Sequence, residues 1–138
     1  MVCARDAARA RASLAEVAAR AGIELSVQPF GRPPELPAAW SGRADLLIST
    51  VPVVLPTDLA SALVKLASTV FDVVYDNYPS PLDRAAHEAG VTLLDGLDLL
   101  VGQAIDQIRL MTGRDADPAP LLAACRAEVL RRVPGKES

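Results

Sequence analysis

The chain has 138 residues, of which 51% are hydrophobic, and its formal net charge is −3 at pH 7. This length allows one domain with a packed core and is too short for two full ones. The acidic balance gives no electrostatic reason to expect nucleic acid as a partner, and Asp72 interrupts the longest apolar run, so no segment reaches membrane-spanning length. Two distant cysteines without metal-ligand spacing favour a reducing compartment. We therefore expect a cytoplasmic protein without a metal site.

Strand and helix patterns alternate along the whole chain. The expected strands are Val2–Ala4, Ile23–Val27, Ala44–Thr50, Thr69–Tyr75 and Val91–Leu94. The expected helices are Ala7–Ala21, Thr57–Ala67, Pro81–Ala89, Gly96–Thr112 and Pro118–Arg132. Two of the strand segments, "ADLLIST" and "TVFDVVY", are nearly continuous apolar runs, which is typical of parallel strands covered on both faces. The alternation predicts an α/β fold with a doubly wound, mostly parallel sheet.

Glycine and proline mark the joints between these elements. Gly22 and Gly90 each follow an alanine-rich helix and precede an apolar run, as a left-handed helix cap would. The stretch "QPFGRPPELPAAWSGR" is the one long connection, and we expect it on the surface.

The turn "ARDAAR" concentrates positive charge where the first strand meets the first helix. Arg5 follows the strand end, and cations are unfavourable near a helix N-terminus, so Arg9 and Arg11 favour a bound anion there. In dinucleotide-binding folds, an arginine at the end of the fold's second strand suits the 2′-phosphate of a nucleotide. In this chain the strand Val2–Ala4 would take that place, with Arg5 directly after it. The alternative is that Asp6 caps the helix and offsets the arginines. Both interpretations stay open at this point.

The segment "FDVVYDNYPSPL" contains two polar residues, Asp72 and Tyr75, in or next to an apolar strand. Asp72 lies in a strand that otherwise reads as buried, so it must be hydrogen-bonded or lie close to the strand's end. Tyr75 falls at the C-terminal end of this strand, the edge where open α/β sheets bind ligands. It is either a ligand contact or an ordinary interfacial tyrosine.

The helix predicted from Gly96 is the third candidate region. A glycine at its first position permits close approach of a ligand to the backbone. Gln103 offers an amide that could serve a polyol, although an ordinary surface glutamine is the alternative. His87, the single histidine, has no cysteine or carboxylate set around it, so we expect neither a nucleophile triad nor a metal site.

Four segments together resemble the C-terminal, nucleotide-binding half of shikimate dehydrogenase. They are "ARDAARA", "DLLIST", "FDVVYDNYPSPLDRAA" and "DGLDLLVGQAIDQIRLMTG", which cover nearly the whole chain. The last is the most specific, because the family has a very similar Gly-Leu-x-x-Leu-Val-x-Gln-Ala segment. The resemblance implies a Rossmann-like fold, NADP as the cofactor, and the reversible reduction of 3-dehydroshikimate to shikimate in aromatic amino acid and chorismate biosynthesis.

The resemblance also implies roles for individual residues. Four positions match cofactor contacts of the family: Arg5, Arg9, Val73 and Gly96. The two arginines match those that hold the 2′-phosphate of NADP, and the other two residues lie at the nicotinamide end. Tyr75 and Gln103 match residues that contact the small-molecule substrate.

The family has further parts before the segment that matches this chain. They are an N-terminal substrate domain, the first nucleotide-binding strand and its Gly-rich loop, and no Gly-rich turn precedes Val2 here. The family's catalytic lysine and aspartate lie in that substrate domain, so we expect a fragment without catalytic residues or turnover of its own. Residues 1–112 would form a truncated NADP-binding domain, and 113–138 a helix and tail that pack on the substrate domain.

In the strand order 3-2-1-4-5-6 the first strand is central, so its loss leaves two inner edges unpaired. Open apolar edges recruit other chains, and we expect a homodimer through them. Two alternative functions stay open. One is a quinate or other cyclic-polyol dehydrogenase of the same superfamily, and the other is a non-catalytic nucleotide-binding or interaction module.

Overall fold

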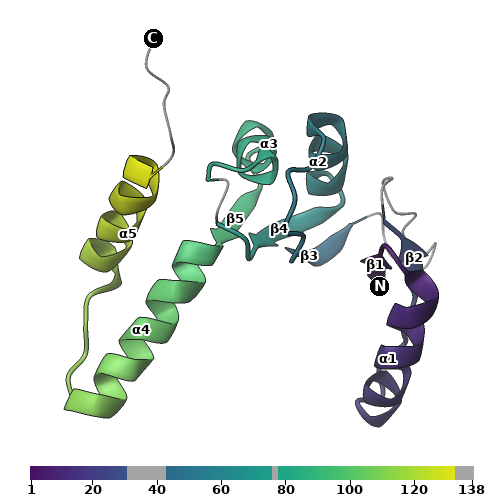
Figure 1. The fold of residues 1–138 in the computed structure, drawn as a ribbon, viewed down its shortest axis with the longest axis horizontal. Coiled ribbons are helices and arrows are strands. Elements are labelled where there is room, and N and C mark those ends of the chain that lie inside the picture. The colour runs from purple at the N-terminus through teal and green to yellow at the C-terminus, as the bar shows by residue number, and fades with distance from the viewer. Residues whose placement is uncertain (31–42, 76–77, 133–138) are drawn as a thin grey trace. The chain divides into compact units, whose positions relative to one another are not determined.

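The computed structural model describes residues 1–30, 43–75 and 78–132, and the chain forms two compact units, Met1–Gly42 and Arg43–Ser138 (Figure 1). Most of the long connection predicted between residues 28 and 43 lies outside the described residues.

The first unit is a pair of parallel strands with one helix between them in sequence. β1 (Val2–Ala4) leads into α1 (Ala7–Arg20), and β2 (Val27–Pro29) then pairs with β1. α1 begins where the Asp6 carboxylate accepts a hydrogen bond from a backbone N–H of the first turn, as predicted. It ends just before Gly22, whose φ of 65° is the left-handed conformation expected of a helix stop.

The second strand was predicted at Ile23–Val27, and this placement is wrong except for its last residue. The Ile23 N–H donates to the Ala18 carbonyl oxygen at 2.9 Å, so the helix cap still holds residue 23. Val27 is the residue that pairs with Val2, the first residue of β1. The register with β1 therefore places β2 at Val27–Pro29.

The second unit contains a parallel sheet with the order β3-β4-β5. Its strands are β3 (Ala44–Ser49), β4 (Ala67–Asp72) and β5 (Thr92–Asp95). α2 (Thr57–Val64) and α3 (Pro81–Ala89) lie side by side on one face of this sheet (Figure 1). The predicted α/β class with parallel strands is confirmed, in two small sheets.

α2 is shorter than the predicted Thr57–Ala67. It ends at Val64, because Ala67 is already the first residue of β4 and pairs with Ala44. Alanine has a high helix propensity, but strand pairing and complete burial of Ala67 override it.

β4 is also displaced from the predicted Thr69–Tyr75. It ends at Asp72, which pairs with Ser49 on one side and Asp95 on the other, the last residues of β3 and β5. The residues that follow therefore extend beyond the ends of both neighbouring strands.

The buried core lies almost entirely in the second unit. Of the hydrophobic residues buried in the described ranges, Val27 alone belongs to the first unit. The others are Leu55, Leu59, Ala60, Val64, Ala67, Val70, Leu82, Ala85, Ala86, Leu97 and Val101. Leu55 precedes α2, and the rest lie in α2, α3, β4 and the first turns of the helix that begins at Gly96, so the core of the second unit lies between its sheet and its helices.

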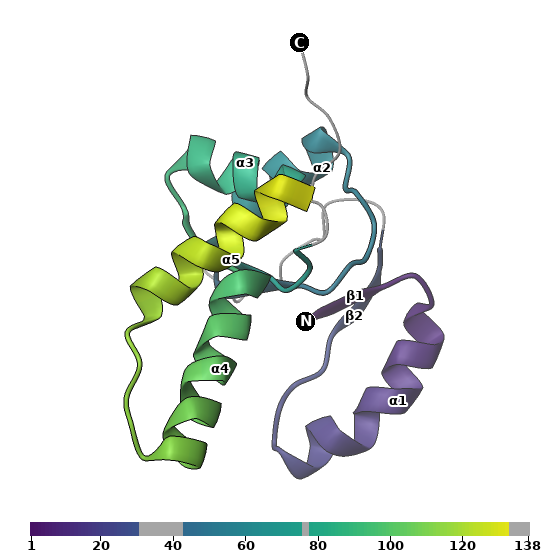
Figure 2. The ribbon, with the colours of Figure 1, turned by 60° about the vertical axis from the view of Figure 1, so that its left-hand side comes forward.

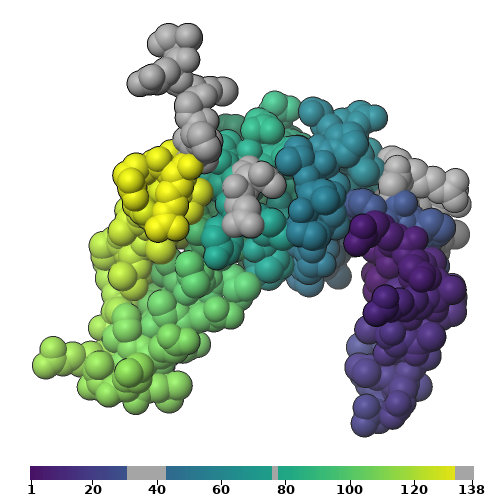
Figure 3. All heavy atoms as spheres, in the orientation of Figure 1, coloured from purple at the N-terminus to yellow at the C-terminus, as the bar shows by residue number. Residues whose placement is uncertain are grey.

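Two helices complete the second unit. α4 (Gly96–Thr112) follows β5 directly, and α5 (Pro118–Arg132) packs against α4 (Figures 2 and 3). The predicted bounds of α3, α4 and α5 are confirmed. No helix in the three described ranges is long and apolar enough to cross a membrane.

Candidate functional site

The turn from β1 into α1 presents two unpaired guanidinium groups. Arg5 and Arg9 are exposed, and neither guanidinium has a hydrogen bond or ion pair with any described residue. The two other arginines of this region are engaged. Arg11 donates to the Val27 carbonyl oxygen at 3.3 Å, and Arg20 lies 3.6 Å from a carboxylate one helical turn away. The structure thus separates the arginines that are available for a ligand from those that serve the fold.

Asp6 shares this turn, and its carboxylate caps the helix. Its Oδ1 accepts from the Arg9 backbone N–H at 2.9 Å, which leaves the Arg9 side chain uninvolved. The predicted cap is therefore present, and it coexists with two unpaired cations at a helix N-terminus. Such a group of donors complements a phosphate, which accepts charge-assisted hydrogen bonds from guanidinium groups.

Three more of the predicted site residues lie together where β4 and β5 end. Asp72 pairs with Asp95, so the residues that follow them, Val73 and Gly96, are neighbours. A Cβ atom built on Gly96 would collide with the Val73 carbonyl oxygen and lie 2.8 Å from Tyr75 Cδ1. The start of α4 is thus in contact with both the Val73 backbone and the Tyr75 ring.

Tyr75 was predicted at the last position of its strand, and this detail is wrong. The ring lies three residues beyond the end of β4, with 39% of the residue exposed. It is supported by Gly96 on one side and keeps an accessible surface, which a ligand contact requires.

Gln103 is exposed on α4, seven residues after Gly96. Seven residues are close to two helical turns, so the two positions share one face of the helix, about 10 Å apart along its axis. Gln103 is therefore on the same side of α4 as the contact with Tyr75, although it is not packed into that contact.

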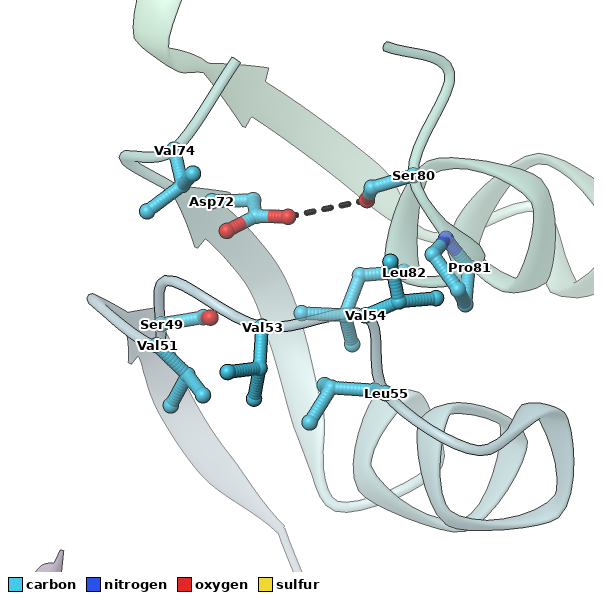
Figure 4. A pocket seen from close by; sticks show the side chains of 10 residues that line it. All are labelled: Ser49, Val51, Val53, Val54, Leu55, Asp72, Val74, Ser80, Pro81 and Leu82. Carbon is cyan, nitrogen blue, oxygen red and sulfur yellow. Dashed lines mark hydrogen bonds between the residues drawn. The ribbon is translucent and has the colours of Figure 1, made fainter. Parts of the chain in front are cut away.

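A small hollow lies at the ends of β3 and β4, beside these residues (Figure 4). Valine, leucine and proline side chains form most of its wall, and the carboxylate of Asp72 and the hydroxyl groups of Ser49 and Ser80 supply the polar surface. Its volume of about 20 Å³ leaves room for about one water molecule. It is therefore too small to be the site of an organic substrate.

Asp72 fulfils the structural duty that the sequence predicts for it. It is 5% exposed, and its Oδ2 accepts from the Ser80 hydroxyl at 2.8 Å (Figure 4). Ser80 in turn caps α3 by accepting from the Asp83 N–H at 3.2 Å. Within the described ranges, no three histidine, cysteine, aspartate or glutamate side chains are grouped as a metal site requires.

Asp83 is a buried carboxyl group of this region whose pKa is raised. Burial raises its pKa, and the negative charge of Asp72 raises it further, while hydrogen bonds from Ser80 act in the opposite direction. Its Oδ1 is buried without a hydrogen-bond partner among the described residues.

Sequence reasoning missed the residues that hold the start of α4. Asp95 is 4% exposed, and its Oδ1 accepts from the N–H groups of Leu97 and Asp98 at 2.9 Å each. Arg126 of α5 lies 3.3 Å from Asp95 and 3.6 Å from Asp98. The spacing of Asp95 and Asp98 in "DGLD" is that of a capping box and could have revealed the first part. No local signal points to Arg126.

The chain is similar to known proteins in sequence and in structure. No protein-family model matches it. A stretch of 109 residues is 34% identical to shikimate dehydrogenase (NADP(+)) of Nitrobacter hamburgensis, and the match covers 72% of this chain and 38% of that protein. The chain thus spans well under half the length of this curated relative.

Solved structures with similar folds come from the same group of enzymes. Shikimate dehydrogenase of Mycobacterium tuberculosis is similar with a TM-score of 0.65 and 29% identity, over 88% of this chain and 45% of that one. Quinate dehydrogenase of Corynebacterium glutamicum, solved in complex with NAD, is similar with a TM-score of 0.58 and 26% identity, over 91% of this chain and 45% of that one.

Proposed function

We propose, from the premise that this chain is a relative of the shikimate dehydrogenases, that it forms the NADP-binding portion of such an enzyme. The enzyme would catalyse the reversible NADPH-dependent reduction of 3-dehydroshikimate to shikimate, a step of aromatic amino acid and chorismate biosynthesis in the cytoplasm. The observation that carries the proposal is the pair of exposed guanidinium groups of Arg5 and Arg9 at the start of α1, which have no partner among the described residues.

The cofactor would lie with its 2′-phosphate at these two arginines. A phosphate monoester carries close to two negative charges at neutral pH, and guanidinium groups bind its oxygens in a planar, two-pronged geometry. NAD has a hydroxyl group at this position, so the arginines favour NADP. Val73 and Gly96 would border the nicotinamide, which supplies the hydride when the cofactor is bound.

The substrate would contact this chain through Tyr75 and Gln103. The phenol of Tyr75 can donate and accept a hydrogen bond, and the amide of Gln103 can do both as well, so each suits a hydroxyl-rich ring. We assign no catalytic residue to this chain. The proton exchange at the reacting hydroxyl would come from groups outside these residues, and residues 113–138 would pack on the domain that holds them.

The test is a titration of the purified chain with NADPH and with NADH, followed by NMR of the backbone amide groups of residues 4–10. We expect NADPH to bind more tightly than NADH, and Arg5→Ala or Arg9→Ala to weaken NADPH binding about tenfold each, since a charge-assisted hydrogen bond contributes about 1.5–3 kcal/mol. Arg20→Ala is the matched control on the same helix and should leave binding unchanged. Equal binding of the two nucleotides would contradict the assignment of NADP.

Turnover gives a second test. The chain alone should not oxidise shikimate with NADP⁺ at any concentration of either compound. Measurable turnover would show that the catalytic groups lie within these residues. It would contradict the proposal that this chain holds no catalytic residue.

A quinate dehydrogenase is the second candidate, favoured by the similarity to the quinate dehydrogenase solved with NAD. This alternative keeps Tyr75 and Gln103 at the substrate and differs in the nucleotide. Preferential binding of NADH in the titration above would favour it.

We also propose that copies of the chain associate through their strand edges. Among the described residues, β3 pairs on one side alone, and Leu46 and Ile48 of this strand are 46% and 56% exposed. Asp45 is the one charged residue of β3, which contains no lysine or proline to protect its edge. Analytical ultracentrifugation should detect a dimer that Ile48→Lys weakens, and a monomer at all concentrations would contradict the proposal.

A further inference from the structure

The contact between the start of α4 and the segment after β4 is unusually close. Gly96 is buried, and a Cβ atom placed on it would overlap the Val73 carbonyl oxygen, approach the Val73 carbonyl carbon to 3.0 Å and approach Tyr75 Cδ1 to 2.8 Å. Real Cβ atoms essentially never come within 3.0 Å of such atoms. Any side chain at position 96 must therefore displace the ring, the backbone of residue 73, or the helix.

The helix is not free to move. Asp95, the residue before Gly96, is buried and holds the first turn of α4 through two hydrogen bonds of 2.9 Å. The Asp98 carboxylate returns a hydrogen bond of 2.9 Å to the Asp95 N–H. Arg126 joins both carboxylates to α5. The first turn of α4 is thus held by the Asp95 cap, by the hydrogen bond to the Asp98 carboxylate and by Arg126 of α5.

The backbone of residue 73 is not free either. The Val73 N–H donates to the Ser49 carbonyl oxygen at 2.9 Å, which continues the β3–β4 pairing by one residue. Asp72, just before it, is paired on both sides and bonded to Ser80. Of the three groups that meet at Gly96, the ring of Tyr75 is the one with freedom to move, since it lies beyond the strand and is 39% exposed.

We propose that Gly96 is a positioning residue for Tyr75. Because the first residue of α4 has no side chain, the Tyr75 ring can lie against the helix, and this contact determines the position of its hydroxyl group. The inference rests on the proposed function for the purpose of that hydroxyl, which is the substrate contact. Gly102 offers a matched comparison, because it lies on the same helix and a Cβ atom there meets nothing within 4 Å.

The experiment is ¹⁹F NMR of the full chain labelled with 3-fluorotyrosine. The chain has two tyrosines, so Tyr78→Phe assigns both signals. In Gly96→Ala the signal of Tyr75 should move by more than its linewidth or split, whereas Gly102→Ala should leave it in place. Both substitutions replace glycine by alanine in a helix, so a difference between them reflects the contact and not helix propensity. A Tyr75 signal that is unchanged in folded Gly96→Ala would overturn the proposal.

A second measurement needs no variant and covers the case in which Gly96→Ala does not fold. The wild-type chain should show a nuclear Overhauser effect between the Tyr75 ring protons and the Gly96 Hα protons, and its absence would also overturn the proposal. The substrate role is tested separately, by adding shikimate with NADPH to the labelled chain. A Tyr75 signal that responds to Gly96→Ala but not to these ligands would support the positioning and count against the proposed function.

Discussion

The two units carry their candidate site residues in opposite ways. In the first unit, Arg5 and Arg9 are exposed side chains just before and within the first turn of α1, a helix without a single buried residue. In the second unit, Tyr75 and Gly96 meet directly above a packed core, with Leu97 of the next position 1% exposed. Charge acts over several ångströms and through flexible side chains, so an anion site needs little support. A close contact such as that at Gly96 needs neighbouring backbone that stays in place, and therefore a packed core.

The largest expected difference between the units concerns side-chain truncation. Leu82 of α3 is 1% exposed, so Leu82→Ala should destabilise the second unit by about 2–5 kcal/mol through lost burial and a cavity. Val17 of α1 is 56% exposed, and Val17→Ala should change stability by less than about 0.5 kcal/mol. Urea denaturation followed by circular dichroism measures both. Similar losses for the two variants would mean that the first unit has a core contact that these residues do not reveal.

The two aspartate caps sharpen the comparison. Asp95→Ala removes two backbone hydrogen bonds and the buried partner of Arg126, so we expect a loss near the upper end of the range of about 0.5–2 kcal/mol for N-caps. Asp6→Ala removes one exposed hydrogen bond, and its cost should lie near the lower end of the same range.

Each cap has its own control. Asp95→Asn keeps an acceptor for the backbone N–H groups and should recover part of the loss, while Asp6→Ser should recover nearly all of it, because serine is an equally good cap. A greater loss for Asp6→Ala than for Asp95→Ala would contradict the view that the second unit is the rigid one.

The smallest expected effect is a dependence on pH that comes from Asp83. Its pKa is raised in the folded chain, so the folded state binds a proton more tightly than the unfolded state does. The stabilising contribution of this group is complete below its unfolded pKa, near 3.8, and is lost as the pH rises through the folded pKa. Asparagine does not titrate, so the stability of Asp83→Asn relative to wild type should increase across this window.

Glu128 provides the control for Asp83, because its shift has the opposite sign. Hydrogen bonds from Arg131 and Arg132 lower the pKa of Glu128 to about 2, so its contribution is lost as the pH falls below about 4.5. Urea denaturation of Asp83→Asn, Glu128→Gln and wild type between pH 3 and pH 7 would test both signs. A constant difference between Asp83→Asn and wild type over this range would contradict the assignment.

The parts of the fold that local chemistry specifies are the parts that sequence could predict. α3 lies between the Ser80 cap and Gly90, and α4 between the Asp95 cap and Gly113, so their bounds follow from nearby residues. The bounds of β3 and β5 differ from the predicted ones by one residue, and those of β2 and β4 by more. All four are set by the strands that they pair with, which local patterns do not contain.

The candidate sites divide in the same way. The sequence shows that arginines cluster in this turn, but it cannot show that Arg9 is available for a ligand while Arg11 is not. The partner of Arg11 is a carbonyl oxygen sixteen residues away. Gly96 and Tyr75 could each be singled out, yet their contact depends on the pairing of Asp72 with Asp95, which is a tertiary fact. The assignment of nucleotide and substrate to these residues stays a prediction.

The close approach at Gly96 has a consequence for any attempt to alter the proposed substrate contact by substitution. A library that varies Tyr75 alone leaves the backbone at Gly96 bare, so no added side chain at position 96 competes for the space beside position 75. A library that varies position 96 at the same time adds a Cβ atom that must displace the Tyr75 ring, the Val73 backbone or the helix. Substitutions that probe the proposed substrate contact should therefore keep Gly96 unchanged and vary position 75 and the exposed side of α4.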